Sequence, residues 1–453
     1  MAAEVNVRLD TGEPVTLSSV LARAGEGTVY GVAGKPGWVA KVFHPDLADL
    51  PTKLGKVAAM VRSTPPGAVQ ADGLVVLTWP LHLISDERGP IGYVMPKIDT
   101  ATSVEIHIMS NPSNRMEPLP NAPQWTKNAT WGHLVNVAAN LCLAVQAVHR
   151  VDAVIGDFQE RNILVADTTE VTLVDCDSMQ FTDASGDQFL CAVGRPEFTA
   201  PELAGCDLRT EAREKPSDLF ALAIHIHQLL LAGNHPFMRG TWTGEGDQPD
   251  ALTLAKAGYW AGGPASLFRT HPLAPPIGFL PVDIQQLFTR AFTMGLTDPT
   301  LRPSAGEWRQ ALLRMRPRTC RRNEHQIPES CGQCPWCAID DEREARRQRQ
   351  AWAPGASGPQ RPASSNRTGP LPAHRGQAAP PKKINPAATG PIRQPAKPAP
   401  PPPPWQRPKV VLTALLIFVV TVLIVTAIIV WVILSGPPTP VAAALNVVGM
   451  LLT

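Results

Sequence analysis

The chain has 453 residues, with 41 lysines and arginines against 39 aspartates and glutamates, so its formal net charge is only +2. This balance argues against binding nucleic acid through a general positive field, and we expect no nucleic-acid partner. The length suffices for a globular domain of two lobes with appendages. Residues 1–23 contain acidic side chains and no long apolar run, so we expect no signal peptide and a cytoplasmic N-terminal region.

Short strands and a glycine-containing loop open the chain. Residues 15–31 predict strand, loop and strand, and the loop contains Gly25 and Gly27. The β-rich run Trp38–Phe43 then carries one lysine, Lys41. Because an unpaired buried charge is costly, a lysine on a buried strand needs an anionic partner, and phosphate oxygens would serve. The alternative is an edge strand whose lysine lies in water.

A helix, two strands and a longer helix follow. Residues 51–62 predict the first helix, while Leu74–Trp79 and Gly92–Ile98 are interpreted as strands joined by a polar turn. Residues 99–128 show no clear period and are expected to form an irregular insertion. A second helix is predicted at Trp131–Arg150 from apolar residues at helical spacing: Leu134, Val137, Ala138, Leu141, Val145 and Val148.

The next stretch, Val154–Ser178, predicts a hairpin with polar groups at its edge. Its two short strands are Ile163–Val165 and Val171–Val174. Three polar side chains flank these strands: Asp157, Asn162 and Asp175. One carboxylate there can accept a proton, and an amide with a second carboxylate can hold a divalent cation through oxygen ligands. The alternative is an ordinary hairpin with solvated acids at its turns.

This hairpin resembles the catalytic core of the eukaryotic-type protein kinase superfamily. Asp157 falls at the position of the catalytic-loop aspartate, and Asn162 at that of the metal-binding asparagine. Asp175 falls on the first residue of the Asp-Phe-Gly metal motif. The resemblance implies a protein kinase that uses ATP and Mg²⁺, with Asn162 and Asp175 as magnesium ligands. Its implied catalytic residues are Asp157, Lys41, Asn162 and Asp175.

Three later segments extend this resemblance in the order expected of a kinase. Thr199–Glu202 resembles the Ala-Pro-Glu segment, and Asp218–Ala223 resembles the Asp-x-Trp-x-x-Gly start of a helix. Asp298–Ser304 resembles the Asp-Pro-x-x-Arg-Pro-Ser segment. In the family the arginine of this segment pairs with the Ala-Pro-Glu glutamate, which implies a buried ion pair between Arg302 and Glu202.

The resemblance also implies where the nucleotide binds. The glycine-containing loop would cover the phosphates, Lys41 would bind the α- and β-phosphates, and Met95–Lys97 would be the hinge beside the adenine. The implied nucleotide-binding residues are Ala22, Gly25, Gly27, Val29, Ala40, Lys41, Met95, Asn162 and Asp175.

The sequence departs from the family at several of these positions. The first two glycines of the loop are Ala22 and Ala24, and the helix at 51–62 lacks the glutamate that pairs with the lysine. Gly156 replaces the arginine that reads a phosphate on the activation segment, expected here at Phe181–Leu203. We therefore expect activity that does not require phosphorylation of this segment.

A group of cysteines follows the kinase-like region. Cys334 and Cys337 form a half-site suited to tetrahedral zinc, which Cys320 and His325 can complete, with Cys331 as a competing ligand. We expect no core in so short a segment, so zinc would supply its folding energy, roughly 10–16 kcal/mol. The alternatives are a disulfide, which a cytoplasm disfavours, and a redox pair.

A kinase-like domain followed by Cys-Pro-Trp-Cys resembles a bacterial family of Ser/Thr kinase-like proteins, over about residues 10–340. Some members of that family carry a helix-hairpin-helix module, which we do not see in this sequence. The expected fold is α+β and two-lobed. The expected regions are an N-lobe (1–98), a C-lobe (99–315), a zinc knuckle (316–340), a disordered Pro-rich linker (341–408), a transmembrane helix (409–435) and a short extracytoplasmic tail (436–453).

The C-terminal part of the sequence predicts a tether and a membrane anchor. Residues 350–408 are rich in proline and contain no acidic residue, so they cannot bury enough apolar surface to fold. Val410–Leu434 is uncharged and would span about 37 Å as a helix, enough for a bilayer core of about 30 Å. Arg407 and Lys409 flank its start, which places the kinase-like domain in the cytoplasm as a single-pass membrane protein.

The function favoured by these features is a membrane-anchored, ATP-dependent kinase that phosphorylates serine or threonine of protein substrates. One alternative is a nucleotide-binding pseudokinase that scaffolds partners at the membrane. A small-molecule phosphotransferase is the other, suggested by Gly156-Asp157. The sequence does not indicate an oligomeric state.

Overall fold

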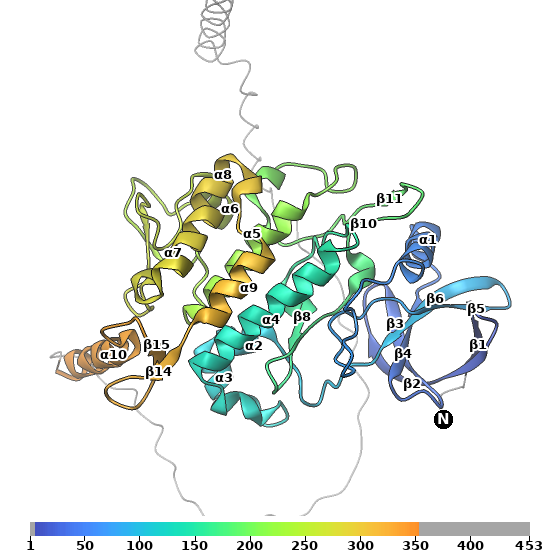
Figure 1. The fold of residues 1–453 in the computed structure, drawn as a ribbon, viewed down its shortest axis with the longest axis horizontal. Helices are drawn as coiled ribbons and strands as arrows, with labels where there is room; N and C mark the ends of the chain where they lie inside the picture. Colours follow the sequence, from blue (N-terminus) through green and yellow to red (C-terminus); the bar gives the residue numbers. More distant parts are fainter. Residues whose placement is uncertain (1–4, 353–453) are drawn as a thin grey trace, which may run out of the picture. The chain divides into compact units, whose positions relative to one another are not determined.

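The N-terminal part of the protein is a closed antiparallel barrel with one helix beside it. The computed structural model describes residues 5–352 (Figure 1). The strand order around the barrel is β1-β2-β3-β4-β6-β5. The strands are β1 (Val5–Leu9), β2 (Pro14–Arg23), β3 (Gly27–Val32), β4 (Trp38–Phe43), β5 (His82–Asp86) and β6 (Gly89–Pro96). The helix α1 (Leu50–Val61) contacts β5 and β6.

Apolar side chains that alternate along the strands fill the interior of the barrel. The residues that point inward form one apolar cluster: Val7, Leu9, Val15, Leu17, Val32, Ala40, Ile84 and Val94. A second cluster joins the outer face to α1 through Phe43, Tyr93 and Val57. Gly27 sits where β3 approaches β4 closely, because a Cβ there would lie 2.5 Å from the carbonyl oxygen of Val42. This glycine is therefore required by strand packing.

The C-terminal part is mainly helical and contains the predicted hairpin, whose strands are β8 and β9. Its helices are α2 (Ile106–Ser110), α3 (Pro112–Met116), α4 (Trp131–His149), α5 (Lys215–Leu230), α6 (Ala251–Lys256), α7 (Val282–Thr289), α8 (Gly295–Thr297) and α9 (Ala305–Arg314). Its strands are β7 (Val104–Glu105), β8 (Ile163–Val165), β9 (Val171–Leu173), β10 (Phe181–Thr182), β11 (Gln188–Phe189), β12 (Thr241–Trp242) and β13 (Phe268–Arg269). The central helix α4 packs against α5 and α9 (Figure 1). By length and composition α4 could cross a membrane, but 67% of its most apolar window is buried, as in a core helix.

Several predicted elements agree with the structure and one strand does not. The predicted helices at 51–62 and 131–150 match α1 and α4 to within one residue at each end. Leu74–Trp79 is not a strand of the barrel, which is instead completed by β5. Its apolar residues Val76, Leu77 and Trp79 are buried in the core of the helical part, so this run connects the two parts. The supposedly irregular residues 99–128 contain α2 and α3.

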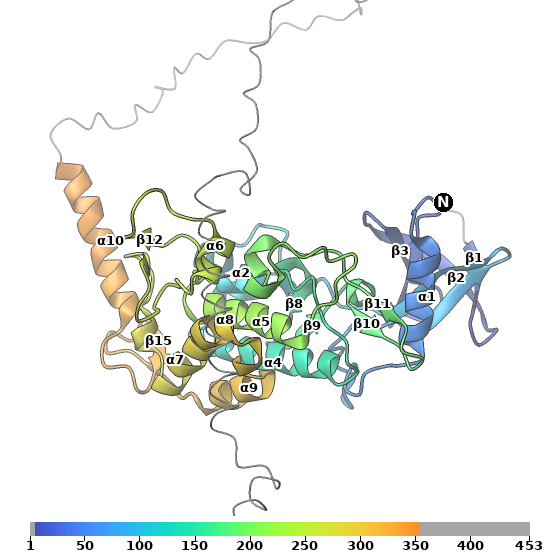
Figure 2. The same ribbon diagram turned by 90° about the horizontal axis from the view of Figure 1, so that it is seen from above.

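The segment after α9 packs against the helical part. It consists of β14 (Pro317–Thr319), β15 (Gln326–Pro328) and the helix α10 (Pro335–Trp352). Figure 2 shows α10 extending away from the helical part, on the side remote from the barrel. The predicted linker thus begins inside α10, because residues 341–352 are helical. The predicted transmembrane segment and tail lie outside the described residues.

Candidate active site

Lys41 lies at the junction of the barrel and the helical part. The strand register places it between Val29 of β3 and Tyr93 of β6, so these three residues share one face of the sheet. Lys41 is 5% exposed. Its Nζ lies 2.9 Å from Oδ1 of Asp175 and 2.7 Å from Oδ2 of Asp177. The lysine is thus paired with two acids from the loop that follows β9, not left in water.

Asp177 is a site residue that the sequence reasoning missed. It is 6% exposed, binds Lys41 through both carboxylate oxygens, and accepts a hydrogen bond of 2.7 Å from the Tyr93 hydroxyl. Burial works to raise the pKa of Asp177, but the ammonium of Lys41 outweighs it and holds the pKa below its usual value. Burial likewise works to lower the pKa of Lys41, and Asp177 and Asp175 reverse this and raise it. Asp177 therefore supplies the carboxylate that α1 lacks.

The buried face of α1 carries a lysine, whereas the kinase resemblance implies a glutamate on this helix. Lys56 is 6% exposed and lies on the side of α1 that faces the site. Burial lowers the pKa of Lys56 to about 8, and nearby Cys191 and Asp177 offset part of that effect. Asp177 thus lies in a field of two lysines, Lys41 from the barrel and Lys56 from the helix.

The hairpin brings the predicted polar residues together. The Asn162 side-chain amide donates to the Asp157 carbonyl oxygen at 2.9 Å and to its Oδ2 at 3.1 Å. Gln159 donates to the same Oδ2 at 2.7 Å. Asp157, Asn162 and Asp175 line one small crevice. Asp175 has a left-handed backbone with φ +59°, a conformation that a non-glycine residue adopts at some cost and that clusters at functional sites.

Asp218 at the start of α5 holds in place the loop that carries Asp157, which is the predicted catalytic loop. Its two carboxylate oxygens accept the backbone N–H groups of Ile155 at 2.7 Å and Gly156 at 3.0 Å. His149, at the end of α4, lies 3.0 Å from the same carboxylate, so its role is to support this anchor. The backbone just before Asp157 is therefore fixed by a charged group that is 2% exposed.

The predicted nucleotide-binding residues do not all face Lys41. Ala22 pairs with Val29, and Met95 pairs with Val39, so these lie on the face that Lys41 shares. Ala40 was predicted to contact nucleotide, but it is fully buried in the barrel interior. The reason is that consecutive strand residues point to opposite faces, and Val39 takes the expected position.

The glycine-containing loop is tied to α1 by an acid at its tip. Glu26, between Gly25 and Gly27, accepts a hydrogen bond from Lys53 at 2.8 Å. A Cβ at Gly25 would meet no atom within 4 Å. The loop therefore has space above Gly25 but is anchored at its next residue.

The backbone at residue 156 requires glycine, which explains why the arginine expected there is missing. It has φ +71°, and a Cβ there would lie 2.8 Å from the sulfur of Cys191. Arg213, which is 4% exposed, donates to the carbonyl oxygen of Gly156 at 3.0 Å and to that of Val193. A buried arginine from outside the catalytic loop thus connects that loop directly to residues of the predicted activation segment.

The predicted ion pair between Arg302 and Glu202 forms, but it is buried only on the arginine side, because the Glu202 side chain is 31% exposed. The two guanidinium nitrogens donate to the two carboxylate oxygens at 2.6 and 2.7 Å. The same nitrogens donate to the carbonyl oxygens of Pro216 and Gly295, each at 2.8 Å. Both terminal nitrogens of Arg302 are thus bonded, while its buried Nε has no hydrogen-bond partner among the described residues. The pair locks the end of the segment 181–203 to the helical core.

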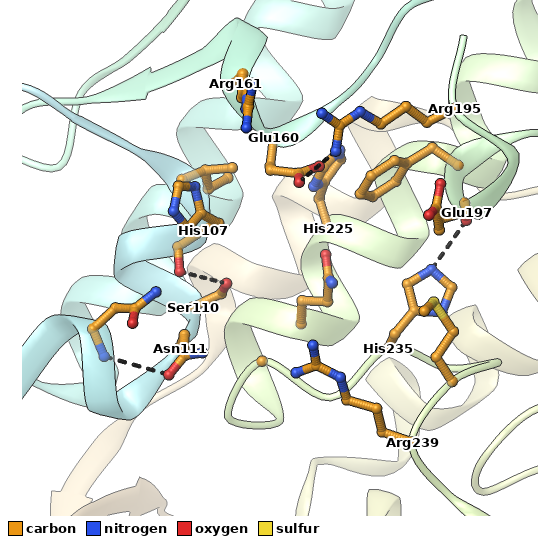
Figure 3. Close-up of a pocket in the computed structure, with 16 residues that line it drawn as sticks. His107, Ser110, Asn111, Glu160, Arg161, Arg195, Glu197, His225, His235 and Arg239 are labelled. Carbon is orange, nitrogen blue, oxygen red and sulfur yellow. Dashed lines mark hydrogen bonds and ion pairs between the residues drawn. The ribbon is translucent and has the colours of Figure 1, made fainter. Parts of the chain in front are cut away.

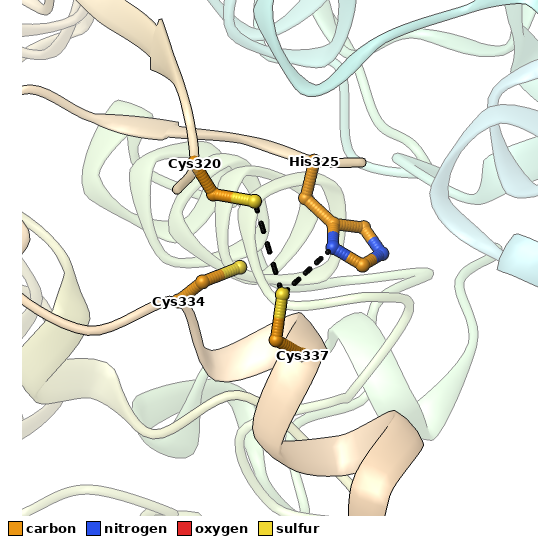
Figure 4. A group of neighbouring side chains, drawn as sticks. All are labelled: Cys320, His325, Cys334 and Cys337. Carbon is orange, nitrogen blue, oxygen red and sulfur yellow. Dashed lines mark hydrogen bonds between the residues drawn. The ribbon is translucent and has the colours of Figure 1, made fainter. Parts of the chain in front are cut away.

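The cysteine group converges as a set of three sulfurs and one imidazole (Figure 4). Cys320 follows β14, His325 precedes β15, and Cys334 and Cys337 flank the start of α10. Their ligand atoms all lie within 4.8 Å of one another. The sulfurs of Cys320 and Cys337 are 3.8 Å apart, and the Cys337 sulfur is 3.5 Å from Nδ1 of His325. Tetrahedral zinc with Zn–S bonds of about 2.3 Å requires sulfurs roughly 3.8 Å apart, so these residues fit zinc.

Cys331 is not part of this set, which decides between the competing ligands. Its thiol donates to the carbonyl oxygen of Gln333 at 2.9 Å. Cys320, Cys331, Cys337 and Ile327 also belong to the main apolar core, and Trp336 packs on Phe279 with ring centroids 5.9 Å apart. The expectation that this segment has no core is therefore wrong, because it shares the core of the helical part.

Comparisons with known proteins and the arrangement of the site both point to kinase-like proteins. No family model matches the chain. Its curated relatives are protein kinases by name, which supports a kinase-like family. They include the protein kinase YegI of Escherichia coli K12, 31% identical over 352 residues, and the protein of that name in Escherichia coli O157:H7, 31% identical over 341 residues. These alignments cover 76% and 73% of this chain, which spans about half the length of the curated relatives it matches.

Proposed function

We propose that this chain is an ATP-dependent protein kinase that transfers the γ-phosphate to serine or threonine of protein substrates. One observation carries the proposal. The Lys41 ammonium, from the barrel, lies 2.9 Å from Asp175, which shares a crevice with Asp157 and Asn162 of the helical part. Phosphoryl transfer depends on such positioned charges more than on covalent chemistry. The similarity to proteins named protein kinase supports the same class.

Each residue of the site has a role in this proposal. Asp157 orients the acceptor hydroxyl and accepts its proton, and the amides of Gln159 and Asn162 hold the Asp157 carboxylate in position. Asn162 and Asp175 offer the oxygen ligands that Mg²⁺ prefers. Bound Mg²⁺ would neutralise charge on the phosphates. Lys41 would bind phosphate oxygens while Asp177 keeps its ammonium in place.

Transfer of labelled phosphate from ATP in the presence of Mg²⁺ tests the proposal. We expect transfer to a generic protein substrate by the wild-type protein and a loss of about a hundredfold or more in Asp157→Ala, because general-base catalysis contributes on that scale. Binding of nucleotide without any transfer would contradict the proposal. It would favour a pseudokinase scaffold, which the replacement of loop glycines by Ala22 and Ala24 also suggests.

Activity without phosphorylation of the activation segment is a second expectation. Arg213 already joins Gly156 to Val193 through a single guanidinium, so no phosphate is needed to connect them. We expect phosphatase treatment to leave transfer unchanged and Arg213→Ala to reduce it roughly tenfold or more, since a charged hydrogen-bond donor is worth about 1.5–3 kcal/mol. Arg209→Ala, at an exposed site nearby, is the control. Loss of transfer after phosphatase treatment would contradict this expectation.

We also propose that the protein is anchored in the cell membrane through residues 410–434, with the kinase-like part in the cytoplasm. The support is the uncharged apolar sequence of this segment and the basic residues that precede it. Sedimentation of the full chain with membranes after an alkaline wash, compared with a chain ending at residue 405, tests this proposal. Recovery of the full chain in the soluble fraction would contradict it.

A further inference from the structure

A cavity of about 400 Å³ lies on the helical part, beside the catalytic loop (Figure 3). Its walls come from α2 and the residues after it, from the catalytic loop, from the predicted activation segment, and from α5 with the loop that follows. We call this cavity the acceptor-side pocket. It was not foreseen from the sequence because it gathers side chains from four separate segments.

The acceptor-side pocket is connected directly to the proposed base. His225 lies at its floor, and its Nε2 is 2.8 Å from the carbonyl oxygen of Phe158, the residue after Asp157. Burial lowers the pKa of His225 to about 4, so the ring is neutral and donates its N–H to that carbonyl. Phe198 stacks on the same ring with centroids 4.6 Å apart. The floor is thus rigid, neutral and one residue away from Asp157.

Charge in the walls of the pocket favours an anion. Arg195 and Glu160 neutralise one another at 3.1 Å. Among the residues that the structure describes, Arg161 and Arg239 make no ion pair, and Glu197 offsets only one of them. Burial lowers the pKa of His235 to about 3, so this ring adds no charge. The pocket therefore holds an excess of one guanidinium.

Arg239 is the side chain most clearly placed for a ligand. Figure 3 shows it on the wall opposite Glu160 and Arg195, with its guanidinium directed toward the interior. Its backbone has φ +59°, a left-handed conformation that costs a non-glycine residue about 1–3 kcal/mol and that persists mainly at functional sites. A guanidinium in such a place can bind a carboxylate or phosphate with two parallel hydrogen bonds.

We propose that the acceptor-side pocket binds an acidic side chain, carboxylate or phosphorylated, of the peptide that carries the acceptor hydroxyl. This inference rests on the proposed kinase function. Glu160 and Arg161 lie three and four residues from Asp157 along the chain. With the contact of His225 to Phe158, this places the pocket beside the proposed base, where a peptide residue near the acceptor can reach it. The structure thus assigns a preference for acidic substrates.

Binding of fluorescent peptides tests this preference without requiring transfer. One peptide carries an acceptor serine flanked by glutamates, and matched peptides carry glutamine, arginine or phosphoserine at the same positions. We expect the wild-type protein to bind the glutamate peptide about tenfold or more tightly than the glutamine peptide, as judged by anisotropy. The phosphoserine peptide separates phosphate from carboxylate binding. Raising the salt concentration should weaken the binding of the glutamate peptide and of the phosphoserine peptide, because the attraction is between partly exposed charges.

Two variants and a control complete the experiment. Arg239→Glu should abolish the preference for glutamate, and Arg239→Gly should do so while relieving the left-handed backbone. Arg88→Glu, which makes the same charge change at a turn of the barrel, should keep the preference. Equal binding of glutamate and glutamine peptides, or equal loss in Arg88→Glu, would overturn the inference. Phosphate transfer without an acidic preference contradicts this inference alone, whereas acidic-peptide binding without transfer to any peptide contradicts only the proposed kinase function.

Discussion

Replacing Asp177 by alanine is expected to destabilise the folded protein by about 3–5 kcal/mol and to abolish most phosphate transfer. The variant leaves the ammonium of Lys41, which is 5% exposed, with only the half-exposed Asp175 as partner. It also leaves the buried hydroxyl of Tyr93 without its acceptor. Chemical unfolding at pH 7 measures the first effect, and transfer of labelled phosphate measures the second.

A matched control for Asp177→Ala is Glu26→Ala. It removes an acid at a similar distance from a lysine, Lys53, but this pair is partly exposed and should contribute only about 0–1 kcal/mol. Equal stability of the two variants would contradict the role assigned to Asp177. Equal stability would mean that the Asp177 carboxylate contributes no more than an exposed ion pair.

The effect of Asp177→Ala should also depend on pH. Lys41 holds the pKa of Asp177 below its usual value, so the pair stabilises the fold above the unfolded carboxyl pKa of about 3.9. That stabilisation is lost as the pH falls through the lower pKa of the folded state. The difference in unfolding free energy between wild type and variant should therefore be full near pH 7 and should shrink below about pH 4.

Removal of zinc is the second change with a large expected effect. We expect the purified protein to contain one zinc per chain, and its removal by a chelator to lower the unfolding temperature by about 10 °C or more, since roughly 1 kcal/mol corresponds to 2–4 °C in larger domains. Trp336 reports the change through its fluorescence, because it directly precedes Cys337 and packs on Phe279. Cys337→Ser should produce the same loss.

Cys331→Ser is the control for this prediction. Cys331 lies in the same segment but bonds to the carbonyl oxygen of Gln333 instead of the cluster, so zinc content should be unchanged. Protein that contains no metal, or that loses zinc equally in Cys331→Ser and Cys337→Ser, would contradict the four-residue site. Unfolding that responds to a reductant and not to a chelator would indicate a disulfide.

Features encoded within one short segment of the chain could be predicted from the sequence. The hairpin with Asp157 and Asn162 could be predicted because alternating apolar residues and turn residues fix it locally. The choice of Cys320 and His325 could be proposed, but only the structure separated them from Cys331. The Arg302 pair was accessible through resemblance alone, because its partner is 100 residues away.

Features that depend on tertiary placement could not be predicted. Asp177 was overlooked because a carboxylate two residues after Asp175 has no local sign of burial. A signal was nevertheless present, since the helix at 51–62 contains lysines and no acid, and Lys41 needed an anion from elsewhere. Leu74–Trp79 has the composition of a strand, but its side chains fill the core of the helical part. Composition alone does not say which core an apolar run joins.

The source of the acid that holds Lys41 determines which movements of the structure can release the lysine. In protein kinases a glutamate on the helix beside the barrel usually holds this lysine, so swinging the helix outward disengages it. Here the acid is two residues from Asp175 on one short loop, and Tyr93 of the barrel steadies it. Outward rotation of α1 would leave the lysine engaged. Under the proposed kinase function, inhibition should instead require a rearrangement of residues 175–177, and compounds that work by displacing the helix should inhibit poorly.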